Sequence, residues 1–484
     1  MLPPSVHAQL AAILPGEALL TAPEATRPYE CDGLTLFREL PAAVALPDTE
    51  AQVVAILRAC HAARVPVVAR GAGTGLSGGA MPHKDGVVLS LAKFRRILAI
   101  DPLARTAVVQ PGVRNLAISE AAAAHNLYYA PDPSSQIACT IAGNVAENAG
   151  GVHCLKYGLT VHNVRRVRGV TIEGEVVEFG NEALDAPGYD LLALINGSEG
   201  LLAVITEVTV KLTPKPQFAQ VALAAFATIE AAGEAVGKVI AEGIIPGGLE
   251  LMDQAATRAV EQFVHANYPL DAAAILLVES DGTPEEVSAE MADIKRVLTD
   301  SGATEIRVSK DEAQRLLFWS GRKAAFPAAG RISPDYYCID GTIPRKALSG
   351  VLHKIAEWSA EYGLRVANVF HAGDGNLHPL ILYDANVPGE ADKTIAFGDR
   401  ILDLCIEVGG TVTGEHGVGV EKLRGACNQF APAELERFLG IKRAFDPHAL
   451  LNPGKAVPTL ARCAEFGRMH VHGGELKHAE LPRY

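Results

Sequence analysis

Two histidines and a downstream Glu-His pair are the residues of this sequence best suited to bind a metal ion. His371 and His378 enclose Gly-Asp-Gly-Asn at 373–376. Side chains seven positions apart would face opposite sides of a straight strand, but Gly-Asp-Gly-Asn is a turn signal. A strand–turn–strand would therefore bring both imidazoles together. With Glu415 they form two histidines and a carboxylate, a set used by open zinc sites and some iron sites.

His416, next to Glu415, is a candidate general base because imidazole titrates near neutral pH. The alternative is that His371, His378 and His416 are ordinary loop histidines. The H-x6-H spacing alone does not decide between the two, although the glycine-flanked Glu-His pair favours a functional site.

A glycine-rich loop, GAGTGLSGG at 71–79, contains a literal G-x-G-x-x-G after an apolar segment expected to be a strand. A dinucleotide fingerprint needs a helix directly after the glycines, because the helix N-terminus binds the pyrophosphate. Here a Pro/Gly loop at 80–86 and a second strand at 87–91 follow, and no acidic residue ends that strand. These features exclude an NAD site of the Rossmann type. The loop could still form an anion-binding nest of backbone N–H groups, or be a flexible surface loop.

Elements on both sides of a proline-rich linker would position these residues. Thr49–Gln52 forms a capping-box start for a helix, and Thr213-Pro214-Lys215-Pro216 breaks regular pairing. The pattern then changes to longer helices and strands, which favours an α+β fold. We expect helices over 231–242, 284–301, 346–362 and 431–445, strands over 275–280 and 336–339, and a β-hairpin over 164–172 and 175–179. We expect four regions: an N-terminal arm (1–40), a cofactor domain (41–216), a substrate domain (217–410) and a C-terminal segment (411–484).

Composition limits the class of protein. The 484 residues are 49% hydrophobic and 20% charged, which excludes wholesale disorder. The net charge of -13 argues against nucleic acid as a partner. No signal peptide or membrane-spanning stretch is apparent. The eight cysteines are scattered without C-x-x-C, which indicates reduced thiols in a cytoplasm and no iron–sulfur cluster in this chain.

With the glycine-rich loop and the histidine–glutamate residues on one chain, the sequence resembles the FAD-linked oxidases of the vanillyl-alcohol-oxidase type. The resemblance covers roughly residues 20–484, and the tail RCAEFGRMHVHGGEL (462–476) is similar to that of the glycolate-oxidising members. The motifs that carry it are RGAGTGLSGG (70–79), PDPSS (131–135), TIAGNVAENAGG (140–151), KYG (156–158), GSEGLLAVITEVTVKL (197–212), GRKAAFPAAGRISPDYYCIDGTIPR (321–345), FHAGDGNLHP (370–379), GEHGVG (414–419) and LNPGKAV (451–457).

The resemblance implies a PCMH-type FAD-binding domain of two subdomains, followed by an α+β substrate domain. It also implies noncovalent FAD, because Ala80 stands where some relatives carry a flavin-linking histidine. The implied FAD contacts come from Arg70, Gly71, Gly73, Thr74, Gly75, Leu76, Ser77, Gly78 and Gly79 at the pyrophosphate, Pro131, Asp132, Pro133, Ser134, Gly143, Asn144, Asn148, Gly150 and Gly151 at the flavin, Gly200 and Ile205 near the adenine end, and Asn452 from the C-terminus.

In the substrate half, the resemblance implies that His371, His378 and Glu415 bind zinc or iron and that His416 is the base. Arg322 would clamp the substrate carboxylate, since a guanidinium pairs with it in a bidentate way. Its alternative is a surface arginine on a helix. Cys338 replaces a lysine of relatives that act on dicarboxylates, which argues against a second carboxylate on the substrate.

The expected activity is oxidation of a small 2-hydroxy acid, glycolate to glyoxylate, with hydride transfer to FAD. The resemblance also implies FAD-like and iron–sulfur partner subunits, which would hold a cytoplasmic protein at the inner membrane. The alternatives are an FAD-linked D-lactate dehydrogenase, a zinc metallohydrolase and a non-catalytic flavin-binding subunit.

Overall fold

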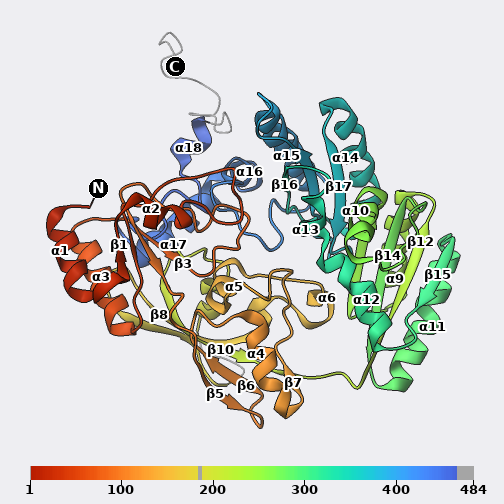
Figure 1. Ribbon diagram of the computed structural model, residues 1–484, viewed down its shortest axis with the longest axis horizontal. Helices are drawn as coiled ribbons and strands as arrows, with labels where there is room; N and C mark the ends of the chain where they lie inside the picture. Colours follow the sequence, from red (N-terminus) through yellow and green to blue (C-terminus); the bar gives the residue numbers. More distant parts are fainter. Residues whose placement is uncertain (1, 184–187, 466–484) are drawn as a thin grey trace.

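Two groups of sheets, one in each half of the chain, form the frame of the protein (Figure 1). The computed structural model describes residues 2–183 and 188–465. The prediction of an α+β fold is confirmed, since helices pack on two antiparallel sheets and one smaller mixed sheet in these residues. The region boundaries proposed at 40, 216 and 410 stay predictions.

The first sheet carries the glycine loop. Its strand order is β1-β2-β4-β3, and β2, β4 and β3 are parallel. The loop at 71–86 joins parallel β3 to β4 without a helix, as expected. Two helices, α1 and α3, pack on this sheet through a shared apolar core. The elements are α1 (Pro4–Ile13), β1 (Leu19–Leu20), β2 (Ala43–Ala45), α3 (Glu50–Ala62), β3 (Val67–Arg70) and β4 (Val87–Ser90).

The predicted capping box at the start of α3 is only half formed. The Thr49 hydroxyl accepts the Gln52 backbone N–H at 3.3 Å, as predicted. The Gln52 side chain does not return to Thr49, because its oxygen accepts the N–H of Asp48 at 2.8 Å. The helix is therefore capped one residue further out than the pattern indicates.

The second sheet is antiparallel, in the order β5-β6-β10-β8-β9. The predicted hairpin is confirmed as β8 and β9. Helices α4 and α5 pack against this sheet, and α5 carries part of the TIAGNVAENAGG motif. The elements are β5 (Ile97–Asp101), β6 (Thr106–Val109), α4 (Asn115–Ala122), α5 (Ile141–Glu147), β8 (Val164–Val170), β9 (Val176–Gly180) and β10 (Val204–Lys211).

The third main sheet forms the second half, with antiparallel pairing and the order β15-β12-β14-β13-β17-β18-β16. One face is covered by α9, α11, α14 and α15, and the other by α10, α12 and α13. The bounds are β12 (Phe218–Phe226), α9 (Ile229–Ala241), β13 (Gly248–Asp253), α10 (Gln254–Val264), β14 (Ala274–Gly282), α11 (Pro284–Asp300), β15 (Glu305–Val308), α12 (Glu312–Lys323), α13 (Ala325–Ala329), β16 (Asp335–Cys338), α14 (Leu348–Tyr362), β17 (Arg365–Phe370), β18 (Pro379–Tyr383) and α15 (Glu390–Glu407).

The C-terminal segment returns to the first half, where its blue ribbon lies against the red and orange elements (Figure 1). After α16 (Leu423–Gln429) and α17 (Pro432–Phe445), residues 450–452 run beside β3. Val67 donates to the Leu450 carbonyl, and Asn452 donates to the Val67 carbonyl, both at 2.8 Å. This pairing carries the LNPGKAV motif to the glycine loop.

The expectation that every thiol is reduced is wrong for one pair. Cys427 of α16 and Cys463 of α18 (Leu460–Glu465) form a disulfide with an S–S distance of 2.08 Å. They are 36 residues apart, so no short cysteine motif predicted the pairing. The tail motif beyond Glu465 lies outside the described residues. None of the helices within those residues is long and apolar enough to cross a membrane.

Candidate active site

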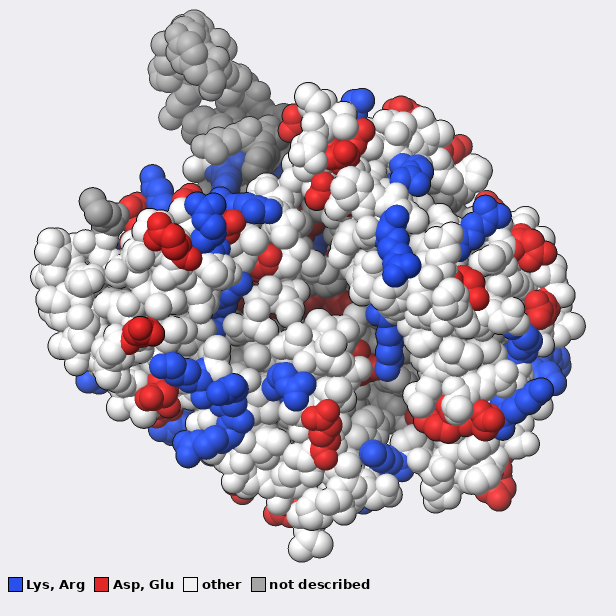
Figure 2. Space-filling model, in the orientation of Figure 1, with Lys and Arg blue, Asp and Glu red and all other residues white. Residues whose placement is uncertain are grey.

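One cavity of about 460 Å³ connects the glycine loop to the histidine cluster. The first half contributes the loop, α5 and the 199–205 segment. The second half contributes Tyr336, His378, Glu415 and His416. Figure 2 shows the surface hollowed between the two halves, with acidic side chains at the base of the hollow. The glycine loop and the histidine cluster, which lie about three hundred positions apart in the sequence, thus line the same cavity.

The glycine loop has the backbone geometry of a close cradle. Gly73 has φ +72°, a left-handed conformation that favours glycine. A Cβ at Gly71 would overlap the hydroxyl of Thr140, which is buried. The guanidinium of Arg70 folds back across the loop and donates to the Cys31 carbonyl at 2.8 Å. The loop is held in place while its backbone lines the cavity.

The predicted cofactor residues divide into two groups. Those that line the cavity are Arg70, Gly71, Gly73, Thr74, Gly75, Leu76, Gly79, Pro133, Ser134, Gly143, Asn144, Gly200 and Ile205. Those that lie behind the lining are Ser77, Gly78, Pro131, Asp132, Asn148, Gly150, Gly151 and Asn452. The structure therefore brings the whole set to one region but gives the second group a supporting position.

The supporting residues hold the walls of the cavity together. The Asn452 side chain donates to the carbonyls of Gly79 at 3.0 Å and Glu199 at 2.6 Å. The Gly150 N–H donates to Glu415 Oε2 at 3.0 Å, which joins the α5 region to the histidine cluster. Contacts of this kind depend on the fold and are not apparent from the motifs.

The histidine turn forms as predicted. His371 follows β17 directly and His378 precedes β18. His371 and Asn376 exchange backbone hydrogen bonds of 3.1 and 3.2 Å, which close the turn. The two imidazole rings come within 5.0 Å, centroid to centroid. Glu415 Oε1 lies 3.3 Å from His371 Nε2 and 3.1 Å from His378 Nε2.

Burial and neighbouring charges act in opposite directions on the pKa of Glu415 beside this turn. Burial by itself raises the pKa of Glu415, but His371 and His378 more than offset it and hold the pKa well below its usual range. Glu250 Oε1 lies 2.9 Å from His371 Nδ1, so a proton on Nδ1 is held there and Nε2 faces Glu415. Glu250 was not recognised in the sequence. Two carboxylates, Glu250 and Asp253, in the otherwise apolar strand β13 were the signal available.

His416 has the environment expected of a neutral base. Its ring stacks on that of His378, with centroids 5.0 Å apart and an interplanar angle of 7°. Burial lowers the pKa of His416 to about 4, so its imidazole is neutral at neutral pH. Its Nδ1 has no hydrogen-bond partner among the described residues. His416 therefore brings a neutral imidazole to the lining of the cavity.

Arg322 occupies a different position from the one expected of an open substrate clamp. It is 1% exposed and lies outside the cavity lining. Its Nε donates to Glu250 Oε2 at 2.5 Å, and its Nη2 lies 3.4 Å from His371 Nδ1. Only Nη1 lacks a partner among the described residues. The alternative of a surface arginine is excluded, and most of the guanidinium is engaged in fixing Glu250 and His371.

A second group that sequence reasoning missed is centred on Asp340. Its carboxylate accepts the N–H groups of Gly414, Glu415 and His416 at 3.1, 3.2 and 3.0 Å. Lys422 Nζ lies 3.0 Å away, and both side chains are 0% exposed. Burial opposes ionisation of Asp340, but Lys422 offsets it and lowers the pKa of Asp340. Asp340 therefore fixes the backbone that presents Glu415 and His416.

Two metal-ligand sets are geometrically available within the described residues. The ligand atoms of His371, His378 and Glu415 lie within 4.8 Å of one another, and so do those of Cys338, His378 and His416. Burial raises the pKa of Cys338 well above its usual range, which disfavours the thiolate that would bind a metal. The first set is the better fit.

The family follows from comparison with known proteins. Residues 41–180 match the model of the FAD binding domain, and residues 215–456 match that of the FAD linked oxidases, C-terminal domain. The chain belongs to the FAD-linked oxidase family and is a flavin-dependent oxidoreductase that binds FAD.

The chain is also similar to individual members of this family. The chain is 61% identical to the glycolate oxidase subunit GlcD of Escherichia coli K12 over 99% of this chain and 96% of the relative. It is 33% identical to a D-lactate dehydrogenase of Anaerostipes hadrus over 84% of this chain and 87% of the relative. A crystal structure of p-cresol methylhydroxylase shares the fold at 17% identity, with a TM-score of 0.81 over 94% of this chain and 97% of that one.

The cradle gives a direct prediction for Gly71→Ala. The added Cβ would overlap the Thr140 hydroxyl and displace the loop. Overpacking of this kind costs about 1–3 kcal/mol, so FAD affinity should fall by about tenfold or more. The measurement is the flavin absorbance retained per protein after gel filtration. Gly350→Ala, in open space on α14, is the matched control; equal flavin retention in the two variants would contradict the role of this loop.

Proposed function

We propose that this chain oxidises a small 2-hydroxy acid, glycolate to glyoxylate, with FAD as the electron acceptor. The observation that carries the proposal is the shared cavity, in which the FAD loop faces His378, Glu415 and His416. The similarity to a glycolate oxidase subunit over nearly the whole chain supports the choice of substrate.

His371, His378 and Glu415 are proposed to hold a divalent ion, zinc or iron. Two imidazole nitrogens converge on one carboxylate oxygen, and Glu250 holds a proton away from that centre. Imidazole nitrogens and a carboxylate oxygen suit both metals. A bound ion would supply positive charge that lowers the pKa of the substrate hydroxyl.

His416 is proposed to take the hydroxyl proton. Its neutral ring and unpartnered Nδ1 support that role. FAD supplies the two-electron acceptor for the hydrogen that leaves the substrate Cα as hydride. Ala80, which lines the cavity, offers no group for covalent attachment, which supports noncovalent binding. Arg322 lies outside the cavity lining, and a contact of its guanidinium with the substrate carboxylate stays a prediction.

The electrons are proposed to leave through FAD-like and iron–sulfur partner subunits. Within the described residues, no group of three cysteines lies close enough to hold a cluster. The name of the E. coli relative describes a subunit, which supports a complex. Such partners would place a cytoplasmic chain at the inner membrane.

Anaerobic reduction of the flavin by a panel of 2-hydroxy acids tests the substrate. Glycolate should bleach the flavin about tenfold faster than D-lactate, since one extra methyl group in a closed site is worth about 1–3 kcal/mol. Similarity to D-lactate dehydrogenases makes D-lactate the second candidate. Faster bleaching by D-lactate than by glycolate would indicate that D-lactate is the substrate. Hydrolysis without bleaching would indicate a metallohydrolase.

Metal removal is expected to slow the same reaction. Treatment with a chelator should lower the bleaching rate by about 10²-fold, because a bound cation supplies several kcal/mol of charge stabilisation. Flavin content should not change, and zinc or iron should restore the rate. Metal content by mass spectrometry, with Glu415→Gln beside the unaltered protein, identifies the ion. A full rate in metal-free protein would contradict the proposed site.

A further inference from the structure

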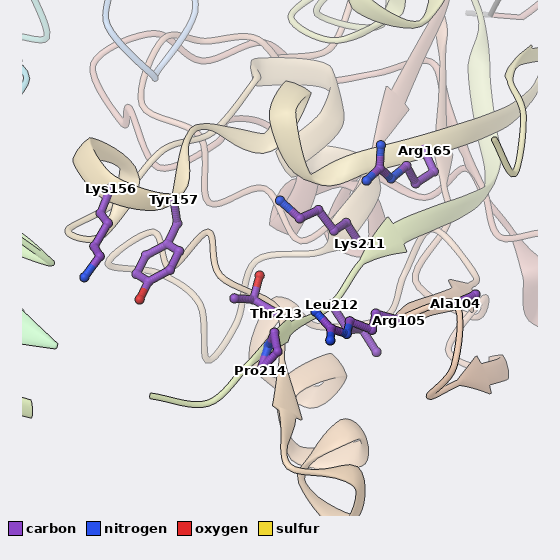
Figure 3. A pocket seen from close by; sticks show the side chains of 9 residues that line it. All are labelled: Ala104, Arg105, Lys156, Tyr157, Arg165, Lys211, Leu212, Thr213 and Pro214. Atoms are coloured by element: carbon purple, nitrogen blue, oxygen red, sulfur yellow. The ribbon is translucent and has the colours of Figure 1, made fainter. Parts of the chain in front are cut away.

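A second cavity, of about 380 Å³, lies on the first half of the molecule and shares no lining residue with the FAD cavity. Figure 3 shows its lining. Arg105 comes from the turn between β5 and β6, Arg165 from β8, and Lys211 from the end of β10. Thr213 belongs to β11 (Thr213–Pro214), where the chain leaves for the second half.

The lining is cationic and lacks acidic residues. The side chains of Arg105, Arg165 and Lys211 make no hydrogen bond or ion pair with any described residue. In Figure 3, Arg165 and Lys211 extend in the same direction from strands that pair with each other. Like charges that share a recess repel one another, and an anion bound between them would relieve that repulsion.

The remaining arginines of β8, unlike Arg165, are paired with acidic side chains. Arg166 pairs with Glu207 at 2.7 Å, and Arg168 pairs with Glu50 at 2.9 Å. The whole chain carries a net charge of -13, so acidic groups are in excess elsewhere. Unpaired cations gather in this recess although the protein as a whole is acidic.

The far wall of the cavity is already neutralised and fixed. Lys156 Nζ lies 2.5 Å from Asp281 Oδ1, and the Tyr157 hydroxyl donates to Asp281 Oδ2 at 2.5 Å. These contacts attach α6 (Cys154–Tyr157) to β14 of the second half. An incoming anion would therefore be bound by the other three cations and would meet a rigid wall opposite them.

We propose that this cavity binds a small phosphate-bearing anion, either inorganic phosphate or a phosphomonoester. The two negative charges of a phosphate match several unpaired cations better than a single carboxylate does. The two guanidinium groups supply the forked donors that suit phosphate oxygens, and Lys211 supplies a point charge. The hydroxyl of Thr213 is a neutral donor in the same wall. The proposal does not depend on the function of the FAD cavity.

Titration of the FAD-loaded protein with phosphate, followed by ³¹P NMR and calorimetry, tests the site. The cofactor cavity is then filled, and chloride keeps the ionic strength constant. Binding should saturate and should weaken by at least about tenfold in the double variant R165Q/K211Q. The matched control is R166Q, the paired neighbour on the same strand. Glycerol 2-phosphate forms the second arm: tighter binding than phosphate indicates a phosphomonoester, and equal binding indicates inorganic phosphate.

Three results would overturn the proposal. They are the absence of saturable binding to the unaltered protein, equal affinity in the double variant, and an equal loss in R166Q. Circular dichroism and flavin content establish that the variants fold. R105Q, in an exposed turn, provides a separate substitution should the double variant not fold, and it too should weaken binding.

Discussion

Replacing His416 by alanine is expected to lower the rate of anaerobic flavin reduction by glycolate about 10²–10⁴-fold, the usual contribution of a general base. The imidazole is neutral because burial lowers its pKa to about 4, and its Nδ1 is free of partners among the described residues. Alanine removes the imidazole that the 414–419 loop contributes to the cavity lining. Stopped-flow absorbance of the flavin measures the effect.

FAD should stay bound in His416→Ala, because the glycine cradle lies on the other half of the molecule. The matched control is His353→Ala, an exposed histidine of α14 whose ring faces Glu230 and Glu357. That variant should reduce its flavin at the unaltered rate. A normal rate in His416→Ala would mean that His416 is not the base.

Replacing Asp340 by alanine is expected to destabilise the protein by about 3–5 kcal/mol, the usual cost of leaving a buried charge without its partner. Lys422 is 0% exposed and would lose the carboxylate 3.0 Å from its Nζ. The backbone N–H groups of Glu415 and His416 would lose their acceptor as well, whereas that of Gly414 would keep the Asp340 carbonyl at 2.8 Å. The free energy of unfolding should therefore fall, and the backbone that positions Glu415 and His416 should no longer be fixed.

Denaturant unfolding monitored by circular dichroism measures this loss, and flavin bleaching measures the activity. Asp300→Ala, at the exposed end of α11, should change the free energy of unfolding by about 0.5 kcal/mol or less. The double variant Asp340→Asn/Lys422→Met removes both charges and should recover much of the stability but not the activity. If Asp340→Ala proved as stable as Asp300→Ala, the buried pair would not support the loop.

Features that arise from neighbouring residues could be predicted from the sequence. The turn between His371 and His378 depends on Gly-Asp-Gly-Asn, whose preference for a turn is local. The absence of a helix after Gly79 follows from the Pro/Gly content of the next seven residues. For the same reason the hairpin of β8 and β9 and the long helices of the second half agree with their patterns. The resemblance to FAD-linked oxidases rests on such contiguous motifs and is confirmed by the family match.

Features that arise from packing between distant positions could not be predicted. Asn452 reaches the carbonyl of Gly79 across 373 positions, and Cys427 meets Cys463 across 36. Glu250 and Asp340 look like isolated acids in the sequence and become the partners of Arg322 and Lys422 only where strands and loops converge.

The sequence by itself determined the residue types of the site, its glycine cradle and its histidine turn. The tertiary structure decided which of these residues face the cavity. It placed Arg322 behind His371 and His416 at the lining, because a side chain's exposure depends on every element packed around it. A buried charge also needs a partner within a few ångströms, and that partner can come from anywhere in the chain.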